Sequence, residues 1–162
     1  NKMKPPGWKY QVHNDIVLNY ELNYQLQLYA YSHIFSLDAD AMSRIGTLDD
    51  KICPGVTAMV GYFNSPFSAD VLHTKVRFYA YDHPEVSFVG YDATMQGGVF
   101  DNGSPYTLSA NDISRIVYKN QSGLVIECDR FYIGYYHCYQ TRQFVTGQSH
   151  SWDGLQLALM IR

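Results

Sequence analysis

The chain has 162 residues, of which 46% are hydrophobic and only 17% are charged, and 12 Lys and Arg against 15 Asp and Glu give a formal net charge of −3. Its length fits one domain over residues 1–162, which could be the C-terminal head of a longer protein because the chain starts at Asn. No basic run offers a footprint for nucleic acid, and no stretch approaches the roughly 18 consecutive apolar residues of a membrane helix. The composition therefore predicts a soluble domain that neither binds nucleic acid nor inserts into a membrane.

The longest regular pattern runs from Ile16 to Tyr31, where apolar and amide-bearing side chains alternate. Successive side chains of a strand point to opposite faces, so this spacing predicts a strand with one apolar face and one polar face. Sixteen residues would extend about 50 Å, well beyond the usual strand of about 5 to 6 residues. We therefore expect a bend, a bulge or a crossover between two sheets within it.

The next segment carries the one helix that the sequence predicts. Asp38 or Asp40 could cap a short helix through Ala39 to Ile45, ended by Gly46, so at most one short helix is expected, near residues 38–46. Turn signals follow at residues 53–55 and 64–66, with an apolar strand between them.

The rest of the chain is a series of short strands separated by turns. Strands are expected over residues 8–12, 75–81, 85–94, 113–118, 124–139 and 155–162, with breaks at residues 82–84 and 119–123, a hairpin tip at 101–104 and a bulge or turn at Gly134. About eight to ten strands in all predict an antiparallel β-sandwich of jelly-roll or related topology. The residues expected in its core are Leu18, Leu22, Leu26, Val76, Phe78, Val125, Leu157 and Leu159.

Catalytic and metal-binding motifs are absent from the sequence. The six histidines are dispersed, no serine lies in a Gly-x-Ser-x-Gly elbow, and no glycine-rich loop precedes a helix start. Three cysteines at positions 53, 128 and 138 are expected to be free buried thiols, although the last two could meet across a hairpin near Ile133. We expect no cofactor and no metal. Glu127 and Asp129 offer the one carboxylate pair with a spacing suited to a glycoside hydrolase.

The segment from Thr141 to Gly154 is the leading candidate for a binding site. A tryptophan can stack on a sugar ring while neighbouring carboxylate, amide and imidazole groups bind its hydroxyls, and an arginine can bind an acidic sugar. The candidate ligand-binding residues are Trp152, Asp153, His150, Gln148 and Arg142, with a second, weaker patch at Tyr79, Tyr81, Asp82 and His83. The alternative is that Trp152 only fills the end of the core.

Fifteen tyrosines and few charges suggest that some faces meet another copy of the chain, with a trimer favoured. The leading hypothesis is therefore a non-catalytic, lectin-like domain that binds a glycan or glycoprotein receptor, as in the head of a viral or phage fibre. This hypothesis places the protein outside the cell or on a virion surface. A carbohydrate-active hydrolase and a structural coat domain are the alternatives.

Overall fold

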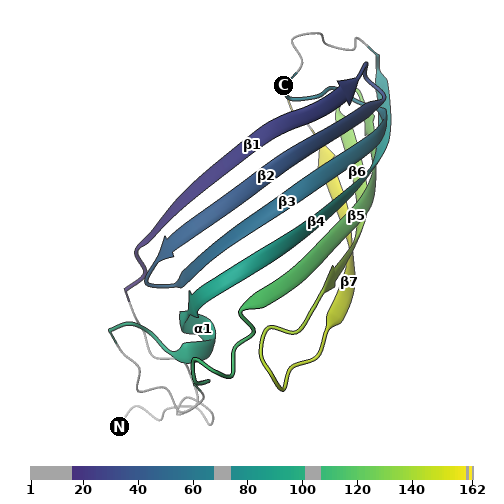
Figure 1. Ribbon diagram of the computed structural model, residues 1–162. Coiled ribbons are helices and arrows are strands. Elements are labelled where there is room, and N and C mark those ends of the chain that lie inside the picture. The colour runs from purple at the N-terminus through teal and green to yellow at the C-terminus, as the bar shows by residue number, and fades with distance from the viewer. Residues whose placement is uncertain (1–15, 68–73, 101–106, 160, 162) are drawn as a thin grey trace.

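A computed structural model describes residues 16–67, 74–100, 107–159 and 161, and within them the chain forms seven strands and one short helix (Figure 1). The strands are β1 (Asn19–Tyr31), β2 (Phe35–Gly46), β3 (Asp49–Tyr62), β4 (Val76–Asp92), β5 (Ile116–Cys128), β6 (Phe131–Gln140) and β7 (His150–Leu159), and the helix is α1 (Ala93–Gln96). Each strand pairs antiparallel with the next strand along the chain. The predicted all-β, antiparallel class is confirmed.

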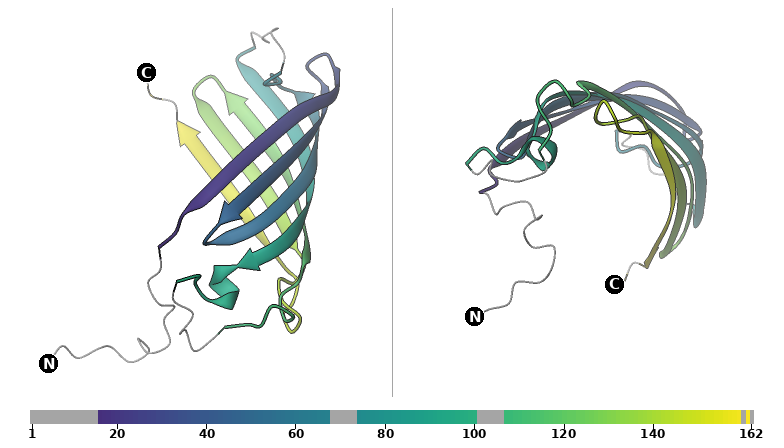
Figure 2. Two further views of the ribbon diagram at one scale, coloured as in Figure 1. Left: turned by 60° about the vertical axis from the view of Figure 1, so that its left-hand side comes forward. Right: turned by 90° about the horizontal axis from the view of Figure 1, so that it is seen from below.

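The seven strands belong to one sheet, in the order β1-β2-β3-β4-β5-β6-β7. Figure 2 shows that this sheet curls into an open arc whose two edges are β1 and β7. The described strands form no second sheet, so the expected two-layered sandwich is replaced by a single curved layer. We call the end of the sheet that carries α1 the α1 end; the β2–β3, β4–β5 and β6–β7 connections lie there.

The strands are longer and more continuous than the sequence predicted. The segment expected to be helical, residues 38–46, is part of β2. Its backbone is hydrogen-bonded to β1 on one side and to β3 on the other, and Asp38 and Asp40 point to the same face of the strand. The breaks expected at residues 53–55, 82–84 and 119–123 lie inside β3, β4 and β5. The strand expected at 8–12 and the hairpin tip at 101–104 fall outside the described residues.

The alternation of apolar and polar residues is present, but the apolar face is the exposed one. Seven of the eight residues expected in the core are exposed, from 47% for Leu26 to 70% for Leu157, and only Val125, at 3%, is buried. On a curved sheet, side chains diverge on the convex face and converge on the concave face. The apolar side chains therefore cover the convex face, and the polar side chains meet on the concave face.

Most of the buried side chains of the concave face are small or polar. They include Cys53, Val117, Val125 and Cys138, together with Ser36, Asp38 and Asp49. Ser36 Oγ donates to Asp38 Oδ1 at 2.8 Å, and Gln27 Nε2 donates to Ser36 Oγ at 3.2 Å. Buried polar groups are usually hydrogen-bonded, and these bonds form a polar network on the concave face beside its buried apolar side chains.

Glycines allow two aromatic rings to lie flat on the concave face. A Cβ on Gly123 would lie 2.5 Å from Cε1 of Tyr81, and a Cβ on Gly154 would overlap the ring of Tyr136. These glycines are the direct cross-strand partners of the two tyrosines. The missing side chains make room for the rings where the sheet curves.

The structure also locates the three cysteines and the one short helix among the described residues. The three cysteines are free, with Cys53 and Cys138 buried and Cys128 exposed, so the expectation of buried thiols holds for two of them. The only helix among the described residues, α1, has four residues, and no described helix is long and apolar enough to cross a membrane.

Candidate functional site on the concave face

The register of β2, β3 and β4 brings an imidazole and a carboxylate together at the middle of the concave face. His83 Nε2 lies 3.2 Å from Asp40 Oδ2, although the two residues come from strands separated by β3. Gly55 lies between them, and a Cβ there would be 2.7 Å from His83 Nε2 and 2.8 Å from Asp40 Oδ2. The pair therefore reaches across β3 only because position 55 has no side chain.

A polar cavity of about 470 Å³ adjoins this pair, lined by residues that include Asn23, Gln25, Thr57 and His83. Asp40 Oδ1 is buried and accepts no hydrogen bond from the described residues. The carboxylate thus orients the imidazole with one oxygen, while its other oxygen stays buried.

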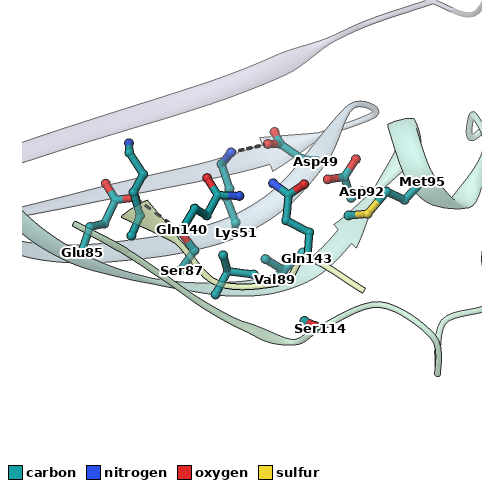
Figure 3. Close-up of a pocket in the computed structure, with 12 residues that line it drawn as sticks. Asp49, Lys51, Glu85, Ser87, Val89, Asp92, Met95, Ser114, Gln140 and Gln143 are labelled. Carbon is teal, nitrogen blue, oxygen red and sulfur yellow. Dashed lines mark hydrogen bonds and ion pairs between the residues drawn. The ribbon is translucent and has the colours of Figure 1, made fainter. Parts of the chain in front are cut away.

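A second cavity, of about 170 Å³, lies toward the α1 end, where side chains from β3, β4 and β5 converge with Gln140 and Gln143 (Figure 3). Lys51 Nζ is paired with Asp49 Oδ2 at 2.7 Å. Lys119 lines the same cavity without an ion-pair partner among the described residues. Ammonium, carboxylate and amide groups in one hollow can bind a polar ligand that carries both donors and an anionic group.

The same cavity contains a short chain of hydrogen bonds. Cys53 Sγ donates to Ser87 Oγ at 3.2 Å, and Ser87 Oγ in turn donates to Glu85 Oε1 at 3.5 Å. Ser87 is therefore held by its neighbours on the cavity wall. No described histidine lies within hydrogen-bonding distance of this hydroxyl, so the arrangement is not that of a serine nucleophile with its base.

A third cavity, of about 280 Å³, lies toward the opposite end of the concave face. The carboxylate of Asp38 is 1% exposed, and its Oδ2 has no hydrogen-bond partner among the described residues. Arg77 and Glu127 close another side of the cavity with an ion pair of 2.6 Å. Within the described part of the chain, no group of three or more His, Cys, Asp or Glu side chains is placed to hold a metal ion.

The structure separates the residues predicted from the 141–154 segment. Trp152 and Asp153 are consecutive in β7 and point to opposite faces, since Trp152 pairs with the buried Cys138 and Asp153 with His137. The Trp152 ring stacks on His150, with centroids 5.3 Å apart. Gln148 and Arg142 lie in the β6–β7 connection, where Arg142 Nη1 donates to the Val145 carbonyl at 3.1 Å.

The second predicted patch is divided in the same way. Tyr79, Tyr81 and His83 share the concave face, whereas Asp82 points to the convex face beside Ser122. The carboxylate pair considered for a hydrolase is also separated. Glu127, in β5, forms an ion pair with Arg77 of β4, whereas Asp129 lies in the β5–β6 turn with a positive φ of 49°. Sequence reasoning missed Asp40 and Lys51, which the alternation of β2 and β3 would have placed on the polar face.

Comparison with known proteins identifies the family. The model of the outer membrane protein LpxR family matches residues 1–161. The chain belongs to the LpxR family. Among solved structures, LpxR from Salmonella typhimurium superposes with a TM-score of 0.74 at 18% sequence identity, over 96% of this chain and 56% of that one. The two share a fold, and this chain spans just over half of the solved LpxR. No curated protein sequence matches the chain.

Membership of the LpxR family corrects the functional hypotheses drawn from the sequence. A soluble glycan- or receptor-binding head outside the cell or on a virion is wrong, because LpxR is an outer membrane protein. The exclusion of membrane insertion is wrong for the same reason, since it rested only on the lack of a long apolar helix. The expectation of a non-enzyme is also wrong, because LpxR is a lipid A 3′-O-deacylase.

Proposed function

We propose that this chain forms part of the wall of an outer membrane lipid A deacylase and that its concave face meets the polar part of the substrate. The observation that carries the proposal is the match of the LpxR family model to residues 1–161. LpxR removes the 3′-O-linked acyl group of lipid A. Because the chain spans 56% of the solved LpxR, other parts of the protein would complete the barrel and contribute to the reaction.

The distribution of side chains supports a membrane-spanning wall. A strand needs about 9 to 11 tilted residues to cross the hydrocarbon of a membrane, and the seven strands have between 10 and 17. Their convex side chains are mostly aliphatic or aromatic and exposed, as lipid-facing side chains of such barrels are. The convex face would therefore meet acyl chains, and the concave face would line the interior.

The cavity at the α1 end supports binding of a phosphorylated sugar. Lipid A carries phosphate, hydroxyl and amide groups, and the ammonium groups of Lys51 and Lys119 would attract the phosphate. Gln140 and Gln143 add amide groups that can donate to or accept from a sugar. Asp49, Glu85 and Asp92 line the same cavity, so a phosphate would bind on the side of the lysines and these carboxylates would accept hydrogen bonds from sugar hydroxyls.

Ester hydrolysis also requires a base that removes a proton from the attacking group. Of the groups described on the concave face, His83 has this chemistry, because Asp40 orients its ring and a polar cavity lies beside it. Water is the nucleophile that such a pair would activate, as no described hydroxyl or thiol is hydrogen-bonded to His83. In this role Asp40 is a positioning residue.

The experiment is to express the full-length protein in the outer membrane of a lipid A-producing host and to analyse extracted lipid A by mass spectrometry. The expected result is lipid A that has lost the mass of its 3′-O-linked acyl group. Correctly folded protein with unchanged lipid A would overturn the proposed function. His83→Gln then tests the base: loss of turnover with KM retained supports it, and full turnover excludes His83 as the base.

A further inference from the structure

The convex face carries a connected group of polar side chains that neither membrane contact nor the concave cavities explain. Its members, which we call the outer polar patch, are Asp82, Asn120, Ser122, Tyr135, His137 and Asp153. Four of them are direct cross-strand partners in one row over β4 to β7, with Asp82 beside Ser122, Ser122 beside His137, and His137 beside Asp153. The patch is therefore continuous across four strands.

Hydrogen bonds inside the patch fix both carboxylates. Asp82 Oδ1 accepts from Asn120 Nδ2 at 2.9 Å and from Ser122 Oγ at 2.7 Å. Asp153 Oδ1 accepts from Tyr135 OH at 2.6 Å and lies 2.9 Å from His137 Nδ1. The second oxygen of each carboxylate has no partner within the described ranges. Each half of the patch thus presents one preorganised, free acceptor on the outer surface.

The surroundings of the patch are apolar and exposed. Leu124 and Leu155 adjoin the patch along β5 and β7, Phe78 lies four residues before Asp82 on the same face of β4, and each is more than half exposed. Charged groups on the lipid face of a membrane barrel are costly unless they lie near the headgroups or have a polar partner. His137 and Asp153 lie close to the α1 ends of β6 and β7, at Gln140 and His150, which places this part of the patch toward one boundary of the membrane.

We infer that the outer polar patch binds the polar headgroup region of a membrane glycolipid, whose hydroxyl and amide N–H groups donate to the free oxygens of Asp82 and Asp153. The occupant must be amphipathic, because exposed apolar side chains of the kind that face acyl chains lie on one side of the acceptors. A glycolipid meets both requirements at once, with its chains along Phe78, Leu124 and Leu155 and its sugar at the patch. The patch also lies on the same convex face as the exposed apolar side chains of the strands.

This inference rests on the membrane location of the family and not on the deacylase activity, so the two can fail separately. The site lies on the opposite face of the sheet from His83 and Lys51, and a lipid held there would not occupy the concave cavities. It would keep glycolipid concentrated at the outer wall, beside the α1 end.

The test is native mass spectrometry of the full-length protein in mixed micelles that contain equal amounts of lipid A and phosphatidylglycerol. Wild-type protein should retain lipid A, or its deacylated product, in preference to phosphatidylglycerol. Asp82→Leu and Asp153→Leu should each reduce this preference by about fivefold, the equivalent of one hydrogen bond. Ser43→Leu, which changes a convex position of β2 outside the patch, should leave the preference unchanged.

Two results would overturn the inference. The first is an unchanged lipid preference in folded variants. The second is a wild-type dimer that the same variants convert to monomer, since that would assign the patch to contact between proteins. If a leucine variant does not fold, Asp153→Asn decides the question, because it keeps the side-chain volume and replaces one acceptor oxygen by an NH2 donor, which should also lower the preference for lipid A.

Discussion

His83 and Asp40 are joined at 3.2 Å across an intervening strand, and the glycine beneath them is what allows the contact. Gly55→Ala would place a methyl group 2.7 Å from His83 Nε2 and 2.8 Å from Asp40 Oδ2. Since these distances are too short for real contacts, we expect the two side-chain ends to move apart and the free energy of unfolding to fall by roughly 1 kcal/mol, the low end of the range for overpacking. Urea unfolding in lipid vesicles measures this change.

Gly90→Ala is the matched control for this prediction. A Cβ at position 90 would lie 3.4 Å from the Asp50 carbonyl oxygen and 3.5 Å from its Cβ, which are ordinary contacts. We expect the control to change stability by less than the Gly55 variant. Equal losses at the two positions would show that the His83–Asp40 contact does not depend on Gly55.

The Tyr136 ring and Gly154 form a second close pair, at the edge of the sheet on β6 and β7. Gly154→Ala should displace the ring and destabilise the protein by roughly 1–3 kcal/mol. In the Tyr136→Ala background the same change should cost much less, because the ring that it displaces is gone. A double-mutant cycle measured by urea unfolding gives the coupling, and additive effects would contradict the packing of this ring on this glycine.

The strands could be predicted largely because alternation is a local property. The pattern in residues 16–31 correctly places β1, and the alternation of Leu155, Leu157 and Leu159 correctly places a strand at the end of the chain. Alternation defines two faces without saying which one is covered. The same pattern describes a soluble sheet with a buried apolar face and a barrel wall whose apolar face meets lipid.

Strand length was the signal that could have separated these two cases. Sixteen alternating residues are too many for an ordinary sandwich strand but suit a tilted strand that crosses a membrane. The concave site was harder to predict, because the Asp40–His83 pair depends on the register of three strands and on Gly55 between them. Asp38 and Asp40 also resemble helix caps in the sequence, whereas in the sheet they face the concave side.

Cysteine reactivity tests which faces are accessible. Cys53 and Cys138 are 1% and 0% exposed on the concave side, whereas Cys128 is exposed on the convex face opposite Val76 and Phe131. A small apolar maleimide should therefore modify one thiol in the folded protein and three after unfolding, because buried thiols are protected. Mass spectrometry counts the adducts and locates them. Modification of Cys138 in the folded protein would contradict the assignment of faces.

Neighbouring positions of β7 point to opposite faces of the sheet, so arginine substitutions at them test which face meets the membrane. Leu157 is 70% exposed on the convex side beside Ile133, and Gln156 lies on the concave side beside Gly134. In a membrane, Leu157→Arg should cost up to about 2–4 kcal/mol, because the guanidinium would enter hydrocarbon. Gln156→Arg should stay within about 0.5 kcal/mol, as substitutions at polar surfaces usually do. Folding into lipid vesicles, followed by the heat-dependent gel mobility of the folded form and by urea titration, measures both. In a soluble protein an arginine at an exposed leucine position would be nearly neutral, so equal stability of the two variants would remove the membrane-facing assignment of the convex surface.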